Sequence, residues 1–282
     1  MTATALIVEL VLTGVVTLTV LLLPAVAAGW DPAASALGRE SAIAIGLGLG
    51  FLIGVVVDRC ADTLLDRWLA VARLSFAHKT RTATQRDAIC ALEPVTDCFP
   101  EDWMRNRLLS RASEHIVRAY EQWRVRIRIT RTVTILTPAV TTSALAALWI
   151  ATRTGEDARA AAILVPAYQM AGLLLFSLAA RPLKATHTTQ ALEKPTTRDR
   201  WTWGLVSPAT GWMSLQLVAA GVMLSALPPD SSRMALGVAA GGAAVTILAA
   251  GAWFRINQTL MQFVWDYCRF EQKADLAAAC CA

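Results

Sequence analysis

The sequence predicts an all-α integral membrane protein with six transmembrane helices and a cytoplasmic helical extension between the second and the third. Three observations predict this fold. The chain of 282 residues is 55% hydrophobic and only 17% charged. Six apolar runs of about twenty residues have almost no charge within them, as is typical of membrane-spanning helices. The Lys and Arg residues gather in alternate connecting segments, which is the distribution that membrane topology produces.

Residues 1–57 are assigned to the first two crossings. The first apolar run, residues 6–28, is long enough to cross a bilayer with some tilt. The second run, residues 41–57, is shorter, so we expect its helix to continue past Asp58 into water. It carries Gly46, Gly50 and Gly54 at four-residue intervals. This spacing lets a neighbouring helix approach closely, although glycine is also common in membrane helices in general.

Residues 58–131 form a polar insertion that carries 14 of the 26 Lys and Arg residues. Apolar residues recur through it at intervals of three and four, which predicts a cytoplasmic helical module continuous with the second and third crossings. Pro100, Glu101 and Asp102 are typical of a helix start. Because the apolar pattern then continues without a break, we expect one long helix from about Pro100 through the third crossing, with a bend allowed at Pro138.

The remaining apolar runs, in residues 132–254, supply the third to sixth crossings. Residues 255–282 are expected to form a cytoplasmic C-terminal tail. Assigning alternate connecting segments to opposite sides of the membrane places 22 of the 26 Lys and Arg residues on one side. Cytoplasmic segments carry the excess of these residues, so both termini are predicted to be cytoplasmic, at the cytoplasmic membrane if the protein is bacterial.

Two ladders of opposite charge lie where the insertion meets the membrane. They consist of Asp58, Asp62 and Asp66 at its start, and of Arg124, Arg128 and Arg131 at its end. In an antiparallel hairpin, Asp58 would face Arg131, Asp62 would face Arg128, and Asp66 would face Arg124. Three interpretations stay open. The charges are solvated, with each exposed pair contributing about 0–1 kcal/mol, or they form an ion-paired hairpin, or they line a charged vestibule for permeating ions or an anionic ligand.

Polar residues also occur inside the apolar runs. The only ionisable one is Glu9, one turn from the cytoplasmic end, where snorkelling or contact with a lipid headgroup explains it. The set that we single out consists of Glu9, Thr13, Thr17, Thr134, Thr137, Thr141, Gln169, Gln216 and Thr246. A polar stripe of this kind either lines a pore or bonds adjacent helices to one another.

Catalytic and metal-binding motifs are missing from the sequence. There is no nucleophile elbow, phosphate-binding loop or zinc-protease motif. The six cysteines form no Cys-x-x-Cys pair and the three histidines are scattered, so we expect no enzymatic activity, no cofactor and no metal site. The net charge of +5 is explained by topology, and a nucleic acid partner is not expected.

These observations lead to three functional hypotheses. The first is a homo-oligomeric channel or membrane-permeabilising effector, gated when a cytoplasmic protein or small-molecule activator acts on the helical module. The alternative is a non-conducting scaffold whose basic cytoplasmic face holds a protein partner or anionic lipid. The third is a secondary transporter. Membrane lipid and further copies of the chain are the expected partners of the membrane region.

Overall fold

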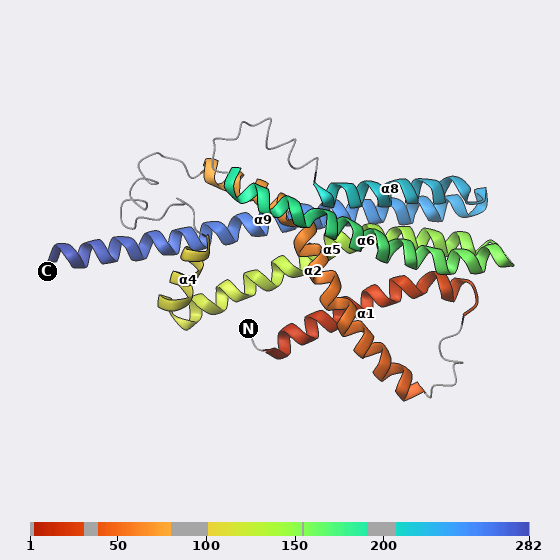
Figure 1. Cartoon of the computed structure of the whole chain (residues 1–282), viewed down its shortest axis with the longest axis horizontal. Helices are drawn as coiled ribbons and strands as arrows, with labels where there is room; N and C mark the ends of the chain where they lie inside the picture. Colours follow the sequence, from red (N-terminus) through yellow and green to blue (C-terminus); the bar gives the residue numbers. More distant parts are fainter. Residues whose placement is uncertain (1–2, 31–38, 80–100, 154, 191–206, 282) are drawn as a thin grey trace. The chain divides into compact units, whose positions relative to one another are not determined.

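The computed structural model describes residues 3–30, 39–79, 101–153, 155–190 and 207–281, and these residues are almost entirely helical. The helices are α1 (Ala3–Ala27), α2 (Arg39–Lys79), α4 (Glu101–Arg111), α5 (Glu114–Ala151), α6 (Glu156–Gln190), α8 (Pro208–Ala226) and α9 (Pro229–Cys281) (Figure 1). No strand occurs within these ranges. The all-helical prediction is confirmed for them.

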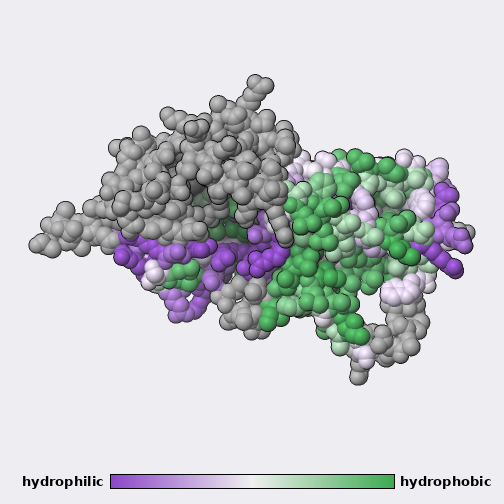
Figure 2. All heavy atoms as spheres, in the orientation of Figure 1, coloured by the Kyte–Doolittle hydropathy of each residue, from purple (hydrophilic) through white to green (hydrophobic). Residues whose placement is uncertain are grey.

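Six of the helices are long and apolar enough to cross a membrane: α1, α2, α5, α6, α8 and α9. Large apolar side chains on these helices are exposed: Leu12 is 65% exposed, Leu217 72% and Ile247 71%. On the face shown in Figure 2, hydrophobic residues cover much of these helices. Side chains of this kind have a favourable environment in lipid hydrocarbon and an unfavourable one in water. The prediction of six membrane-spanning helices is supported to this extent.

The chain divides into two compact units. The first consists of Met1–Trp68 and Arg128–Gly251, and the second of Leu69–Ile127 and Ala252–Ala282. Helix α2 continues well past Asp58, as expected from its short apolar run. Helices α5 and α9 likewise contribute residues to both units without a break in the helix.

In the first unit, α1 and α2 cross at a point where backbones touch. A Cβ atom on Gly14 would lie 1.4 Å from the carbonyl oxygen of Gly50, and a Cβ atom on Gly54 would lie 1.9 Å from that of Leu10. Only glycine permits so close an approach. At Gly46 nothing lies within 4 Å, so of the three glycines singled out, Gly50 and Gly54 lie at the crossing and Gly46 does not.

Helices α5, α6, α8 and α9 pack against one another in the same unit. The indole N–H of Trp212 donates to the carbonyl oxygen of Ile135 at 3.0 Å, which joins α8 to α5. The rings of Trp212 and Phe176 meet edge to face, with centroids 6.4 Å apart, which joins α8 to α6. Gly242 on α9 lies directly against Thr141 on α5. Trp212 therefore packs between α5 and α6 with its one polar atom hydrogen-bonded.

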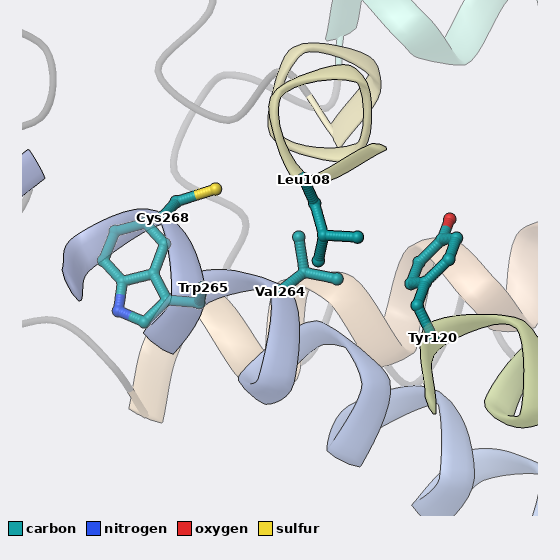
Figure 3. Close-up of a cluster of buried hydrophobic side chains, with 5 residues drawn as sticks. All are labelled: Leu108, Tyr120, Val264, Trp265 and Cys268. Carbon is teal, nitrogen blue, oxygen red and sulfur yellow. The ribbon is translucent and has the colours of Figure 1, made fainter. Parts of the chain in front are cut away.

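In the second unit, α4 packs against α5 and α9 through one apolar cluster. Leu108 comes from α4, Tyr120 from α5, and Val264, Trp265 and Cys268 from α9. Figure 3 shows the Leu108 side chain pointing toward Val264. Leu108 has no exposed surface, so it is the central contact of α4 in this cluster.

The expectation of one long helix from Pro100 is wrong. Helix α4 ends at Arg111 and α5 begins at Glu114, so the chain changes direction at Ala112 and Ser113. Serine is a favoured residue immediately before a helix, and Glu114 lies in the first turn of α5, where an acidic group is favoured. The break allows α4 to place Leu108 against α9.

The C-terminal segment that was expected to form a tail is helical, and its cytoplasmic placement stays a prediction. Residues 255–281 continue α9, and Val264, Trp265 and Cys268 are buried. Apolar residues at intervals of three and four explain this packing, because they form one face of a helix. This segment therefore belongs to the same compact unit as α4.

Replacing Gly14 with alanine tests the helix crossing. Gly14→Ala forces backbones apart and is expected to lower the free energy of unfolding by about 1–3 kcal/mol. Gly48→Ala is the matched control, because nothing lies within 4 Å of Gly48 and alanine favours helix by about 0.5–1 kcal/mol. Unfolding by titration with a denaturing detergent measures the free energy of unfolding of both variants. Equal effects at the two positions would contradict the crossing.

Candidate functional site

The first candidate site is an ion cluster in which Arg131 of α5 bridges two carboxylates of α2. Its Nη2 donates to Asp58 at 2.5 Å, and its Nη1 donates to Asp62. The side chains of Arg131 and Asp58 are only 11% and 19% exposed, whereas that of Asp62 is 52% exposed. A guanidinium can bind two acceptors at once because its donors form a planar fork. The pair with Asp58 is therefore the stronger link between α2 and α5.

Only the first ion pair has the expected register. Asp58 pairs with Arg131 as expected, but Asp62 binds Arg131 and not Arg128. The two aspartates are one turn apart on α2, within reach of a single guanidinium. Arg124 stacks over the ring of Tyr120, with 5.9 Å to the centroid. The side chain of Asp66 lies outside the described part of the structure, so its expected pair with Arg124 stays a prediction.

Glu9 of α1 lies close enough to this cluster to interact electrostatically with Arg128, Asp58 and Arg131. Its Oε2 atom is buried and has no hydrogen-bond partner among the described residues. The structure places Glu9 near charges of α2 and α5, and the snorkelling or headgroup contact expected from the sequence stays a prediction. The cluster thus joins three helices and contains three carboxylates and two guanidinium groups, which does not favour binding of an anion there.

The threonines of the polar stripe bond to their own helices. The hydroxyls of Thr17, Thr134, Thr137, Thr141 and Thr246 each donate to the carbonyl oxygen one turn earlier, at 2.7–2.9 Å. Thr13 supplies the carbonyl for Thr17. Each hydroxyl has a single proton and two lone pairs, so these bonds use the donor of each side chain and leave its oxygen as an acceptor.

Gln169 and Gln216 meet in the interior between α6 and α8. The side-chain N–H of Gln216 donates to Oε1 of Gln169 at 2.8 Å, and Gln169 donates to the carbonyl oxygen of Ala139 on α5 at 3.5 Å. The two side chains are 1% and 3% exposed. The hydroxyl of Thr142 on α5 lies 3.0 Å from the carbonyl oxygen of Pro138 in its own helix and 3.3 Å from that of Gln216, so its single proton is shared between the two acceptors. The described geometry of these residues is that of interhelical bonding.

Two residues at these contacts were not singled out from the sequence: Gly14 and Trp212. Gly14 is one of several small residues in α1, and no spacing distinguishes it. The indole N–H of Trp212 donates to a backbone carbonyl of another helix. Backbone carbonyls occur at every residue, so a sequence pattern carries no signal for such a bond.

Among the described residues, no group of three His, Cys, Asp or Glu side chains lies close enough together to hold a metal ion. No protein-family model, curated protein or solved structure matches the chain. The geometry of the described residues shows one kind of interaction: ion pairs and hydrogen bonds hold helices together at the boundary of the apolar region and in its interior.

Double-mutant cycles test the ion cluster. Arg131→Gln combined with Asp58→Asn is expected to give a coupling free energy of about 1–2 kcal/mol, because both partners are largely buried. The cycle of Arg131 with Asp62 should give less than about 1 kcal/mol, because Asp62 is screened by solvent. The cycle of Arg128→Gln with Asp62→Asn is the comparison and should give a smaller coupling than the cycle of Arg131 with Asp62; a larger coupling there would restore the register expected from the sequence.

A second cycle tests the glutamine pair. Gln216→Met leaves Oε1 of Gln169 buried without its donor and is expected to lower the free energy of unfolding by about 1–2 kcal/mol. Adding Gln169→Met should cost less than the sum of the two single changes, because neither glutamine then leaves a buried amide without its partner. Ser225→Ala, at an exposed serine bonded within its own helix, is the control. Strictly additive effects would argue against the pair.

Proposed function

We propose that the chain is an integral membrane protein that acts as a non-conducting scaffold and holds a cytoplasmic partner on the second unit. Both termini and the second unit lie in the cytoplasm in this proposal, because 22 of the 26 Lys and Arg residues fall on that side. The partner is a protein, and the membrane region anchors it at the bilayer.

The observation that carries this proposal is the packing of α4 on α9 in the second unit. Leu108 is buried among Tyr120 and Val264, and Nε of Arg107 contacts Oε2 of Glu271 at 3.3 Å. Tyr267 donates its hydroxyl proton to the other oxygen of Glu271 at 2.6 Å. A buried apolar contact framed by an ion pair fixes the position of α4, as a binding platform requires.

The polar stripe supports a scaffold better than a pore within one chain. Its threonine protons are used inside their own helices, and Gln169 and Gln216 bond to each other in the interior. Both glutamine side chains are buried, so the described residues also give no reason to prefer a secondary transporter, which would have to offer them to a substrate.

A homo-oligomeric channel is the second candidate, and one observation favours it. On α9, Gly237 and Gly241 lie one turn apart with nothing within 4 Å of either. Glycines at this spacing allow close approach of another helix, so a second copy of the chain could pack there. In this alternative, conduction follows a path between copies, and a protein or small-molecule activator of the second unit gates it.

Replacing Leu108 tests the scaffold. Leu108→Ala removes the buried contact of α4 and is expected to cost about 2–5 kcal/mol in the second unit, with loss of a stoichiometric partner purified from native membranes. Leu109→Ala is the matched control, because Leu109 is 42% exposed; it should retain the partner. Membrane insertion of both variants is checked by resistance to alkaline extraction.

Conductance separates the two candidates. The purified wild-type chain in planar bilayers should remain silent, with or without the partner, if it is a scaffold. Reproducible single-channel currents that Leu108→Ala alters, together with an oligomeric mass of the solubilised protein, would replace the scaffold with the channel.

A further inference from the structure

In the first unit, an arginine between two candidate membrane helices lies over the ring of a tryptophan. The guanidinium of Arg153, between α5 and α6, is 5.4 Å from the centroid of Trp149. Packing fixes the ring, because Trp149 contacts two buried clusters, one containing Leu145 and the other Ile150. Arg153 is exposed, and its side chain forms no ion pair or hydrogen bond among the described residues. Its N–H groups can therefore donate to an external acceptor.

The first two turns of α6 change from charged to apolar beside this pair. Asp157, Ala161 and Leu164 follow one another at intervals of four and three, so they lie on one face of the helix. Ala161 and Trp149 both pack against the same buried cluster of α5 and α6, which brings this face close to the ring. Asp157 is exposed, and Leu164 is 65% exposed. A charged surface that becomes apolar beside an indole is typical of the boundary between headgroups and hydrocarbon.

We propose that Arg153, Trp149 and Asp157 form a binding site for the zwitterionic headgroup of phosphatidylethanolamine. Arg153 binds the phosphate, because a guanidinium offers several N–H donors to the oxygens of one phosphate. The indole ring holds the guanidinium by a cation–π interaction. Asp157 accepts a hydrogen bond from the ammonium group, and Leu164 contacts an acyl chain. The site uses residues of the first unit alone and is independent of whether the second unit holds a protein partner.

The charges at this boundary favour a zwitterionic headgroup over an anionic one. Arg153 and Arg159 flank Glu156 and Asp157 in the sequence, so the four charges cancel and the segment has no net charge to attract an anionic lipid. All four side chains are exposed, and none forms an ion pair within the described part of the chain. A headgroup with both charges can pair with Arg153 and Asp157 at once. A primary ammonium also has N–H donors for a carboxylate, which the quaternary ammonium of phosphatidylcholine lacks.

Lipid titration of the full chain tests this site. The purified protein in micelles is titrated with phosphatidylethanolamine, phosphatidylglycerol or phosphatidylcholine, and bound lipid is counted by native mass spectrometry. The wild type should bind phosphatidylethanolamine most tightly. Arg153→Gln removes the phosphate contact and should weaken this binding about tenfold, the equivalent of one charge-assisted hydrogen bond. Asp157→Asn removes the ammonium contact and should weaken binding of phosphatidylethanolamine by a similar factor without weakening that of phosphatidylglycerol.

Two substitutions serve as matched controls. Arg233→Gln removes another exposed arginine of the first unit, in the first turns of α9. Glu156→Gln removes the carboxylate next to Asp157, which lies on a different face of α6 because adjacent helical residues do not face the same way. Both variants should keep the wild-type affinity for phosphatidylethanolamine.

Specific outcomes would overturn the proposal. Equal binding of phosphatidylethanolamine by the wild type and Arg153→Gln, both shown to be folded by thermal unfolding, would do so. Binding of phosphatidylglycerol by the wild type as tightly as phosphatidylethanolamine would remove the ammonium contact. Displacement of the bound lipid by inorganic phosphate would assign the site to a soluble anion. Retention of phosphatidylethanolamine in the presence of inorganic phosphate supports the lipid site.

Discussion

Lipid hydrocarbon offers no hydrogen-bond partner, and this constraint governs the polar groups of the six apolar helices. A polar side chain there is stabilised when it bonds to its own helix or to a neighbouring one. Thr134, Thr137 and Thr141 take the first route and donate to their own backbone. Gln169, Gln216 and Trp212 take the second route, and their bonds join α5, α6 and α8. The described polar groups in this region are thus bonded partly within a helix and partly between helices.

The same constraint explains where the helices touch most closely. Between helices in lipid the hydrophobic effect contributes little, because the surrounding chains are as apolar as leucine. Association then depends on close packing, and the contact of Gly14 with Gly50 and Gly54 brings two backbones together. The pairing of Arg131 with Asp58 and Asp62 holds the same helix α2 to α5. Steric fit and charge thus act on different parts of α2.

The sequence predicted the helices better than their contacts. Apolar runs and spacing identify the six long helices, and the continuation of α2 past Asp58 follows from its short run. The break at Ser113 was missed because Leu108, Ala112 and Ile116 keep the helical spacing through it, and a change of direction leaves that spacing intact. Spacing also places Gly46, Gly50 and Gly54 on one face, but it does not show where along this face α1 crosses.

The side-chain pairings were partly predictable for a similar reason. Asp58 and Arg131 could be expected to face each other, because α2 and α5 leave the apolar region at these two residues. The next pair depends on the rotation of each helix and on the reach of the arginine, so Asp62 binds Arg131 instead of Arg128. Glutamines in apolar runs indicate buried hydrogen bonds, but which groups they bind depends on how the helices pack.

The crossing of α1 and α2 also bears on the order of assembly during synthesis. These helices are consecutive in the chain, so the loop that their contact closes is short and its entropic cost is small. The contact at Gly14 can form as soon as the second helix enters the bilayer. The bonds of Arg131 to Asp58 and of Trp212 to Ile135 each join residues more than seventy positions apart, so they must wait for later segments. The N-terminal pair of helices can therefore act as the nucleus on which the rest of the first unit is built.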